Sequence, residues 1–72
     1  MGKTKKALIK DAKEINNIEE GKEVVLFFNS GQEYTGIFKG LDDDQILLKS
    51  LNSEHTIGLP KDRLTGFLER IA

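Results

Sequence analysis

The stretch GQEYTGIFKGLDDDQILLK, residues 31–49, says more about the fold than any other part of the chain. A turn glycine, Gly31, precedes a predicted strand that contains a second glycine, Gly36. Because glycine weakens the interior of a strand, Gly36 among good strand formers indicates a sharp bend. An acidic turn then begins at Asp42, and the apolar strand at 46–48 follows it. A bent strand with a tight return predicts a small sheet that curls into a barrel.

The apolar pattern on either side of this stretch also has a period of two, from residue 23 onward, which indicates strands. Turn residues divide the region into five predicted strands, at 24–28, 33–41, 45–51, 54–59 and 64–71. Residues 60–63 form a short turn, with one turn of 3₁₀ helix as an option. The strand at 24–28 is apolar on both faces, which indicates burial on both sides or an exposed functional face. Short strands with tight connections predict a closed or nearly closed antiparallel barrel over residues 23–71.

Residues 4–18, TKKALIKDAKEINNI, are predicted to form an α-helix before the strands. Leu8, Ala12 and Ile15 fall on one face at helical spacing. Thr4 is the expected N-cap, and Gly21 is the expected stop. A single short amphipathic helix is unstable alone, so it is expected to lie across an open end of the barrel.

The chain length of 72 residues predicts a single domain spanning residues 1–72. Such a chain buries only roughly 60% of its unfolded surface, so small domains rely on disulfides, metals or self-association. There is no cysteine and a single histidine, His55, which excludes disulfides and argues against a zinc site. Self-association is therefore the expected source of added stability.

The net charge of −1 conceals an uneven distribution. Residues 1–13 carry five lysines and one aspartate, whereas residues 14–72 carry six basic and eleven acidic side chains. The basic segment either binds along a nucleic-acid phosphate backbone, which releases counterions, or forms the solvated face of the predicted helix.

No apolar run has the length of a membrane span or the pattern of a signal peptide. The lack of cysteine fits a cytoplasmic protein.

No group of residues in the sequence has the pattern of a catalytic or metal site. The aspartates at 42–44 are consecutive and do not converge as calcium ligands do, so a solvated turn is the better interpretation. His55 lacks an arranged catalytic partner, which favours a surface position. Tyr34 either stacks on a base or packs beside the bend, and packing is the better interpretation. Phosphate loops and paired acids are absent. The sequence predicts no enzyme, no cofactor, no metal and no small-molecule substrate.

Between residues 24 and 69 the chain resembles the Sm/LSm superfamily, and most closely its bacterial Hfq branch. The resemblance rests on Gly31, Gly36, an aspartate six residues further on, Asp42, and the ILLK stretch at 46–49. It implies an N-terminal helix on a strongly bent five-stranded SH3-like barrel, the Sm fold. It also implies a homomeric ring, a hexamer or heptamer, in which the fourth strand of one subunit pairs with the fifth of the next. Open strand edges invite such pairing, and a head-to-tail contact that closes gives a ring.

The resemblance further implies single-stranded RNA as a partner and places candidate binding residues in two loops. In the loop after the family aspartate, the position that stacks on a base falls on Asp44, whose carboxylate repels phosphate. Between the fourth and fifth strands, Lys61 falls on the family lysine and Asp62 replaces its histidine. Arg63 adds a second cation beside Lys61.

On the opposite face, Phe27 falls on the family position for a stacking aromatic, with Gln32 and Thr35 nearby. Phe27 and Phe28 form such a platform or simply pack in the core or at a subunit interface.

Two hypotheses about function follow from the sequence. The chain is an Sm-like ring that binds single-stranded RNA with weak or atypical specificity, which the basic N-terminus favours. Alternatively, it is an oligomeric structural or protein-interaction module without base-specific binding, which the acidic turn favours.

Overall fold

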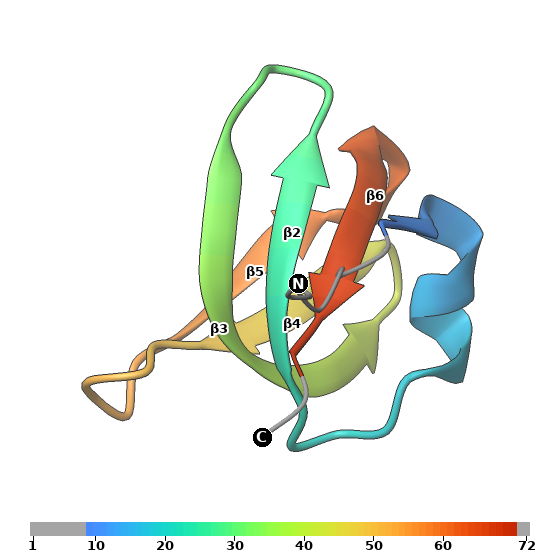
Figure 1. The fold of residues 1–72 in the computed structure, drawn as a ribbon. Coiled ribbons are helices and arrows are strands. Elements are labelled where there is room, and N and C mark those ends of the chain that lie inside the picture. Colours follow the sequence, from blue (N-terminus) through green and yellow to red (C-terminus); the bar gives the residue numbers. More distant parts are fainter. Residues whose placement is uncertain (1–8, 71–72) are drawn as a thin grey trace, which may run out of the picture.

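Residues 9–70, which the computed structural model describes, form one bent antiparallel sheet of six strands with two 3₁₀ helices (Figure 1). The strands lie in the order β1-β6-β2-β3-β4-β5. In chain order, the elements are β1 (Lys10–Asp11), η1 (Ala12–Asn17), β2 (Glu23–Phe28), β3 (Glu33–Asp42), β4 (Gln45–Lys49), β5 (Thr56–Pro60), η2 (Lys61–Arg63) and β6 (Leu64–Glu69).

The strands expected from the period of two are present as β2 to β6, and the chain is mainly β. In β2 the side chains of Val24, Leu26 and Phe28 are buried, while the residues between them are half-buried on the other face. The short 3₁₀ turn expected after the fourth predicted strand is present as η2. The strands could be predicted because β2, the middle of β3, and β4 bury alternate residues against one core.

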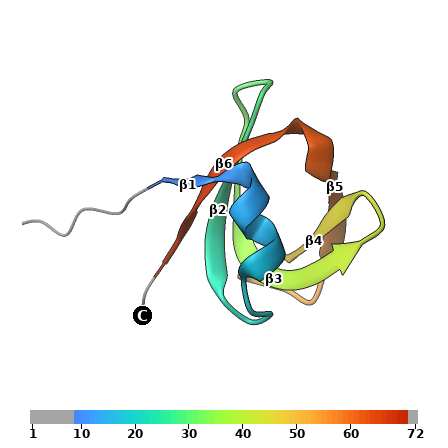
Figure 2. The ribbon, with the colours of Figure 1, turned by 90° about the vertical axis from the view of Figure 1, so that its right-hand side faces the viewer.

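The predicted α-helix over residues 4–18 is wrong for the residues that the structure describes. Lys10 and Asp11 pair with β6 as β1, and the six residues of η1 coil as a 3₁₀ helix (Figure 2). Two asparagines end this segment, and asparagine favours a helix less than the residues before it. A short amphipathic segment gains little from helix formation alone, so pairing with β6 and burial of Ile15 decide its conformation.

Some of the apolar residues that were expected on one face of the predicted helix nevertheless face the core. Ile15 is buried, and Ala12 and Ile18 pack against the core as partly buried residues. Gly21 does not end a helix, because η1 ends at Asn17. Instead it turns the chain toward β2 with a φ of 98°. The expected N-cap, Thr4, and Leu8, which was expected on the apolar face of the helix, lie outside the described residues.

The sheet is not closed within residues 9–70, so the predicted closed or nearly closed barrel is not confirmed. β5 pairs with β4 alone, and β1 pairs with β6 alone, so β1 and β5 form its two edges. The turn η2 carries the chain from β5 to β6, and Pro60 at the end of β5 has no N–H to donate to another ladder. The five-stranded SH3-like barrel is therefore observed only as a bent, open antiparallel sheet.

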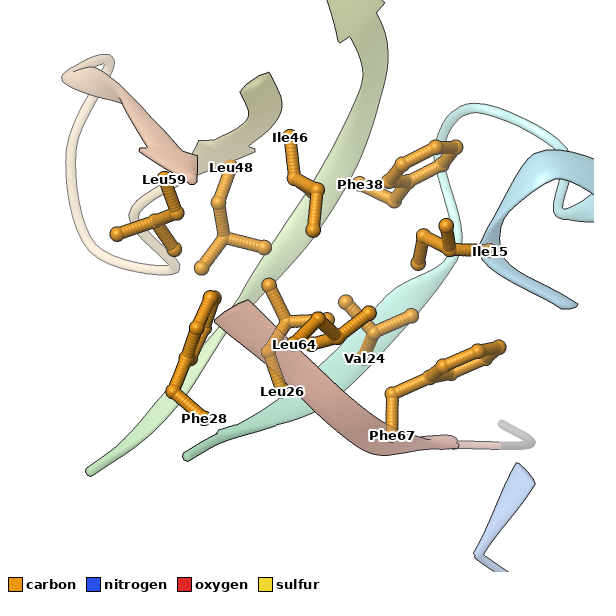
Figure 3. Packing of buried hydrophobic residues seen from close by; sticks show 10 residues of the cluster. All are labelled: Ile15, Val24, Leu26, Phe28, Phe38, Ile46, Leu48, Leu59, Leu64 and Phe67. Carbon is orange, nitrogen blue, oxygen red and sulfur yellow. The ribbon is translucent and has the colours of Figure 1, made fainter. Parts of the chain in front are cut away.

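The core is one cluster of buried apolar side chains that the bent sheet encloses (Figure 3). Ile15 and Phe38 lie at one end of the cluster, and Phe28 and Leu59 lie at the other. Ile15 is only 1% exposed, so η1 contributes to the core rather than resting on its surface. The buried residues are Ile15, Val24, Leu26, Phe28, Phe38, Ile46, Leu48, Leu59, Leu64 and Phe67.

β3 has a register irregularity next to Gly40, four residues after the glycine at which the sequence predicts a bend. The register between β3 and β4 shifts between Phe38 and Gly40, and Gly40 has a φ of 112°. An extra residue in one strand bends it and increases its twist. At Gly36, an added Cβ would meet the carbonyl oxygen of Lys49 and lie 2.8 Å from Cγ of Leu48. Gly36 therefore permits the close approach of β4.

Candidate nucleic-acid interface

A groove at one end of the sheet gathers side chains from the β2–β3 turn and from the segment around η2. It encloses about 500 Å³. One wall comes from residues 28–34, and the other comes from the end of β5 and from η2. The lining residues are Phe28, Asn29, Ser30, Gln32, Tyr34, Leu59, Pro60 and Arg63. Two of the predicted RNA-binding residues, Gln32 and Arg63, thus face the same space.

One backbone hydrogen bond joins the two walls, and another shapes the β2–β3 turn. The N–H of Asn29 donates to the carbonyl oxygen of Arg63 at 2.9 Å, which ties the β2–β3 turn to η2. Within the turn, Gly31 has a φ of 92° and its N–H donates to the carbonyl of Phe28 at 2.9 Å. Glycine adopts this left-handed conformation without steric cost. Main-chain contacts thus help to shape the groove.

The first wall combines an aromatic pair with an amide. Tyr34 meets Phe28 in a T-shaped contact, with ring centroids 5.5 Å apart and an interplanar angle of 89°. The hydroxyl of Tyr34 donates to Oε1 of Gln32 at 3.1 Å, and the hydroxyl of Ser30 lies 3.5 Å from the same oxygen. Because the carbonyl side of Gln32 is engaged, its amide nitrogen is the group that remains to donate to a ligand.

Arg63 supplies the positive charge of the groove. Its side chain is exposed, whereas Leu59 beside it in the lining is buried. A guanidinium presents several fixed N–H donors that suit a phosphate or the edge of a base. An aromatic ring, an amide donor and a guanidinium thus surround one open space of the size of a small organic group.

Lys61 and Asp44 form a second position, which is not part of the groove lining. The N–H of Lys61 donates to the carbonyl oxygen of Asp44 at 2.7 Å, which joins η2 to the acidic turn. The ammonium of Lys61 donates to Oδ1 of Asn16 in η1 at 2.9 Å. The acidic turn is tight, since Asp43 has a φ of 56°, and the side chains of the three aspartates are exposed. This position therefore carries more negative than positive charge.

Phe27 and Thr35 lie apart from both positions. Side chains alternate along β2, so Phe27 points away from the face on which Phe28 is buried, and it is half-buried there. Thr35 pairs with Val25 in the register of β2 and β3, and it is exposed. Of the two phenylalanines, only Phe28 lies in the core. The six candidate residues consequently occupy three places rather than one site.

Sequence reasoning missed several groove residues. Tyr34, for which packing beside the bend was the preferred interpretation, lines the groove, and Asn29 and Pro60 were not expected there. Their meeting depends on the backbone contact between the β2–β3 turn and η2, whose partners Asn29 and Arg63 are far apart in the sequence. No local pattern in the sequence predicts such a contact. The composition of residues 29–31 predicted a turn, but it did not predict that this turn would contact η2.

Other kinds of site have little support among residues 9–70. No group of three or more histidine, cysteine, aspartate or glutamate side chains gathers there as metal ligands do. His55 is exposed in the connection between β4 and β5, where its N–H donates to the hydroxyl of Ser53 at 3.2 Å. In the same part of the chain, no helix has the length and apolar character needed to cross a membrane.

Comparison of the chain with known proteins gives no match. No family model matches it, and neither the curated proteins nor the solved structures yield a similar protein. The Sm/LSm resemblance therefore stays a prediction that rests on the residues of the sequence between positions 24 and 69.

Proposed function

We propose that this chain is an Sm-like subunit that assembles into a homomeric ring and binds single-stranded RNA weakly at the groove beside η2. The observation that carries the proposal is the composition of the groove, in which Tyr34, Gln32 and Arg63 line one space. Proteins that bind single strands combine aromatic stacking with cationic contacts to the backbone. Sequence-specific reading of RNA uses unpaired bases that stack and form hydrogen bonds at their edges.

Each groove residue has a role in this proposal that follows from its contacts. The T-shaped contact with Phe28 and the hydrogen bond to Gln32 hold the ring of Tyr34 in place, so a base that stacks on it loses little entropy. The amide nitrogen of Gln32 donates to a base acceptor. Arg63 contacts the adjoining phosphate. A single groove cation predicts weak binding, because affinity for nucleic acid grows with the number of neutralised phosphates.

The uncharged sequence and the edge position of β5 support assembly through the sheet edges. From Thr56 to Pro60 the strand carries no charged side chain, and its one partner within the described sheet is β4. Proteins that stay monomeric usually protect such an edge with charges, bulges or a covering element. Ile57 on this strand is 46% exposed, and Leu51 in the adjoining loop is 47% exposed. Pairing of β5 with β6 of a second copy would cover this edge.

The alternative function, an oligomeric structural or protein-interaction module without base-specific RNA binding, has its own support. Three exposed aspartates follow one another next to η2. Lys61, the family lysine by resemblance, is hydrogen-bonded to Asn16 and is not among the residues that line the groove. The two functions differ in one measurable property, which is affinity for short RNA at low salt.

Replacing Arg63 with glutamine is expected to weaken RNA binding about tenfold at low salt, since a charge-assisted contact is lost. The slope of log affinity against log salt should also fall by about one unit. U-rich and A-rich oligonucleotides titrated by fluorescence anisotropy at two salt concentrations measure both effects. Arg70→Gln is the matched control, because it removes the same charge at the opposite end of β6, where Arg70 lies 3.5 Å from Glu23. Equal affinities for the two variants, or no binding of either oligonucleotide, would reject the RNA proposal.

Replacing Asp44 with asparagine is expected to raise RNA affinity about two- to threefold at low salt, because it removes one repulsive charge beside η2. The backbone carbonyl that accepts the N–H of Lys61 is unchanged by this substitution. The gain should disappear at high salt, where charges at this range are screened. Glu54→Gln, on the exposed connection between β4 and β5, is the control and should leave affinity unchanged. An equal gain in both variants would indicate a general charge effect and would remove η2 from the RNA path.

A further inference from the structure

β1 occupies an edge that the proposed ring contact requires. One edge of β6 pairs with β2, and the other pairs with β1 (Figure 2). Lys10 and Asp11 of β1 lie opposite Phe67 and Gly66, in the middle of β6. While these residues stay paired, the middle of β6 has no free edge for a strand of another subunit.

The contact between β1 and β6 is small. β1 has two residues, and Ile9 before it is 66% exposed although it is apolar. Its side chain passes close to Gly66, where an added Cβ would lie 3.0 Å from Cγ2 of Ile9. Lys10 lies 3.0 Å from Oε1 of Glu69, but the Lys10 side chain is 46% exposed, and such surface ion pairs contribute little.

The opposite edge of the sheet offers a longer strand. β5 has five residues against the two of β1, so it can form more ladder hydrogen bonds with the same edge of β6. Pairing would also cover Ile57, whereas pairing with β1 leaves Ile9 largely exposed. The apolar area removed from water therefore favours β5 of a second copy once the local concentration is high enough.

We propose that β1 is an internal competitor for β6, and that β5 of a second copy of this chain displaces it when subunits assemble. This inference rests on the proposed ring. At low concentration β1 covers β6 and holds the subunit as a monomer. At high concentration the intermolecular pairing wins. The strength of the β1 contact thereby sets the concentration at which assembly begins.

A reversible lock on β1 tests the competition. The register that pairs Lys10 with Phe67 places Ile9 opposite Leu68 at the next step. The chain has no cysteine, so Ile9→Cys combined with Leu68→Cys introduces one possible bridge. Light scattering on the full-length double variant should show a monomer when oxidised and an assembly when reduced. Non-reducing electrophoresis confirms that the bridge is within one chain, and the two single-cysteine variants are controls.

A second variant weakens the β1 contact. Lys10→Glu places a negative charge beside Glu69, so assembly should begin at a concentration about two- to fivefold lower than in the parent. Lys13→Glu makes the same change in charge on the exposed face of η1 and should leave that concentration unchanged.

The outcomes separate the competitor from the ring. If the oxidised and reduced double variants assemble equally, β1 does not compete, and the ring proposal stands. If the parent, the reduced double variant and Lys10→Glu all remain monomeric, the ring proposal fails and the competitor fails with it. If Lys10→Glu and Lys13→Glu shift assembly equally, net charge alone controls it, and the competitor is rejected.

Discussion

A Gly36→Ala variant is expected to lose about 3 kcal/mol of the free energy of unfolding, because the new methyl group has no space. A Cβ at this position would meet the carbonyl oxygen of Lys49 and would lie 2.8 Å from Cγ and 3.2 Å from Cδ2 of Leu48. One of these contacts is main chain of β4, which moves only if the sheet moves. Urea unfolding followed by circular dichroism measures the loss.

Gly58→Ala is the matched control for this variant. Gly58 is also a strand glycine, but its added Cβ would meet the exposed side chain of Gln45, which rotates away at small cost. The control should change the free energy of unfolding by about 0.5 kcal/mol or less. If the two alanine variants are equally stable, β3 and β4 do not approach as closely at Gly36 as described.

A Phe67→Ala variant is expected to lose about 4 kcal/mol, since truncating a buried phenylalanine removes its burial and leaves a cavity. Phe67 is 0% exposed and is the largest fully buried side chain. It belongs to the core cluster and lies opposite Leu26 in the pairing of β6 with β2 (Figure 3). A small domain has a total stability on the order of 5 kcal/mol, so this variant should be largely unfolded at room temperature. Thermal unfolding and the dispersion of amide resonances report the effect.

Ile57→Ala provides the comparison for Phe67→Ala. Ile57 is 46% exposed, so its truncation should cost less than about 1 kcal/mol. Phe67→Leu should recover much of the loss, because it refills part of the space with an apolar side chain. Similar losses for Phe67→Ala and Ile57→Ala would place Phe67 outside the core.

The strands of this protein were predictable because their signals are local. Val24, Leu26 and Phe28 alternate with half-buried neighbours, and the turns carry glycine, asparagine and aspartate. The N-terminal segment was mispredicted because its apolar spacing fits an α-helix as well as a 3₁₀ turn. Pairing of Lys10 and Asp11 with β6 depends on a strand more than fifty residues away, and no local pattern reports it.

The candidate site was predictable in part for the same reason. Gln32 and Arg63 were expected as binding residues and lie in one groove, although they were assigned to opposite faces. Phe27 and Thr35 were expected to bind RNA together with Gln32, but they do not line the groove. The alternation of side chains along β2 turns Phe27 away from the face that buries Phe28. Lys61 was expected to bind RNA together with Arg63, but its ammonium donates to Asn16 and it does not line the groove. Side-chain partners of this kind follow from tertiary packing rather than from spacing.

Tyr34 gives the protein an optical reporter at the groove. It is the single tyrosine of a chain that has no tryptophan, so intrinsic ultraviolet emission comes chiefly from this one phenol. The ring meets Phe28 edge-on, and its hydroxyl is bonded to Gln32. A nucleobase that stacks on the ring quenches the emission, whereas a ligand held at Lys61 or on the face of Phe27 leaves it nearly unchanged. The protein can therefore indicate, without any attached dye, which of its surfaces a ligand has occupied.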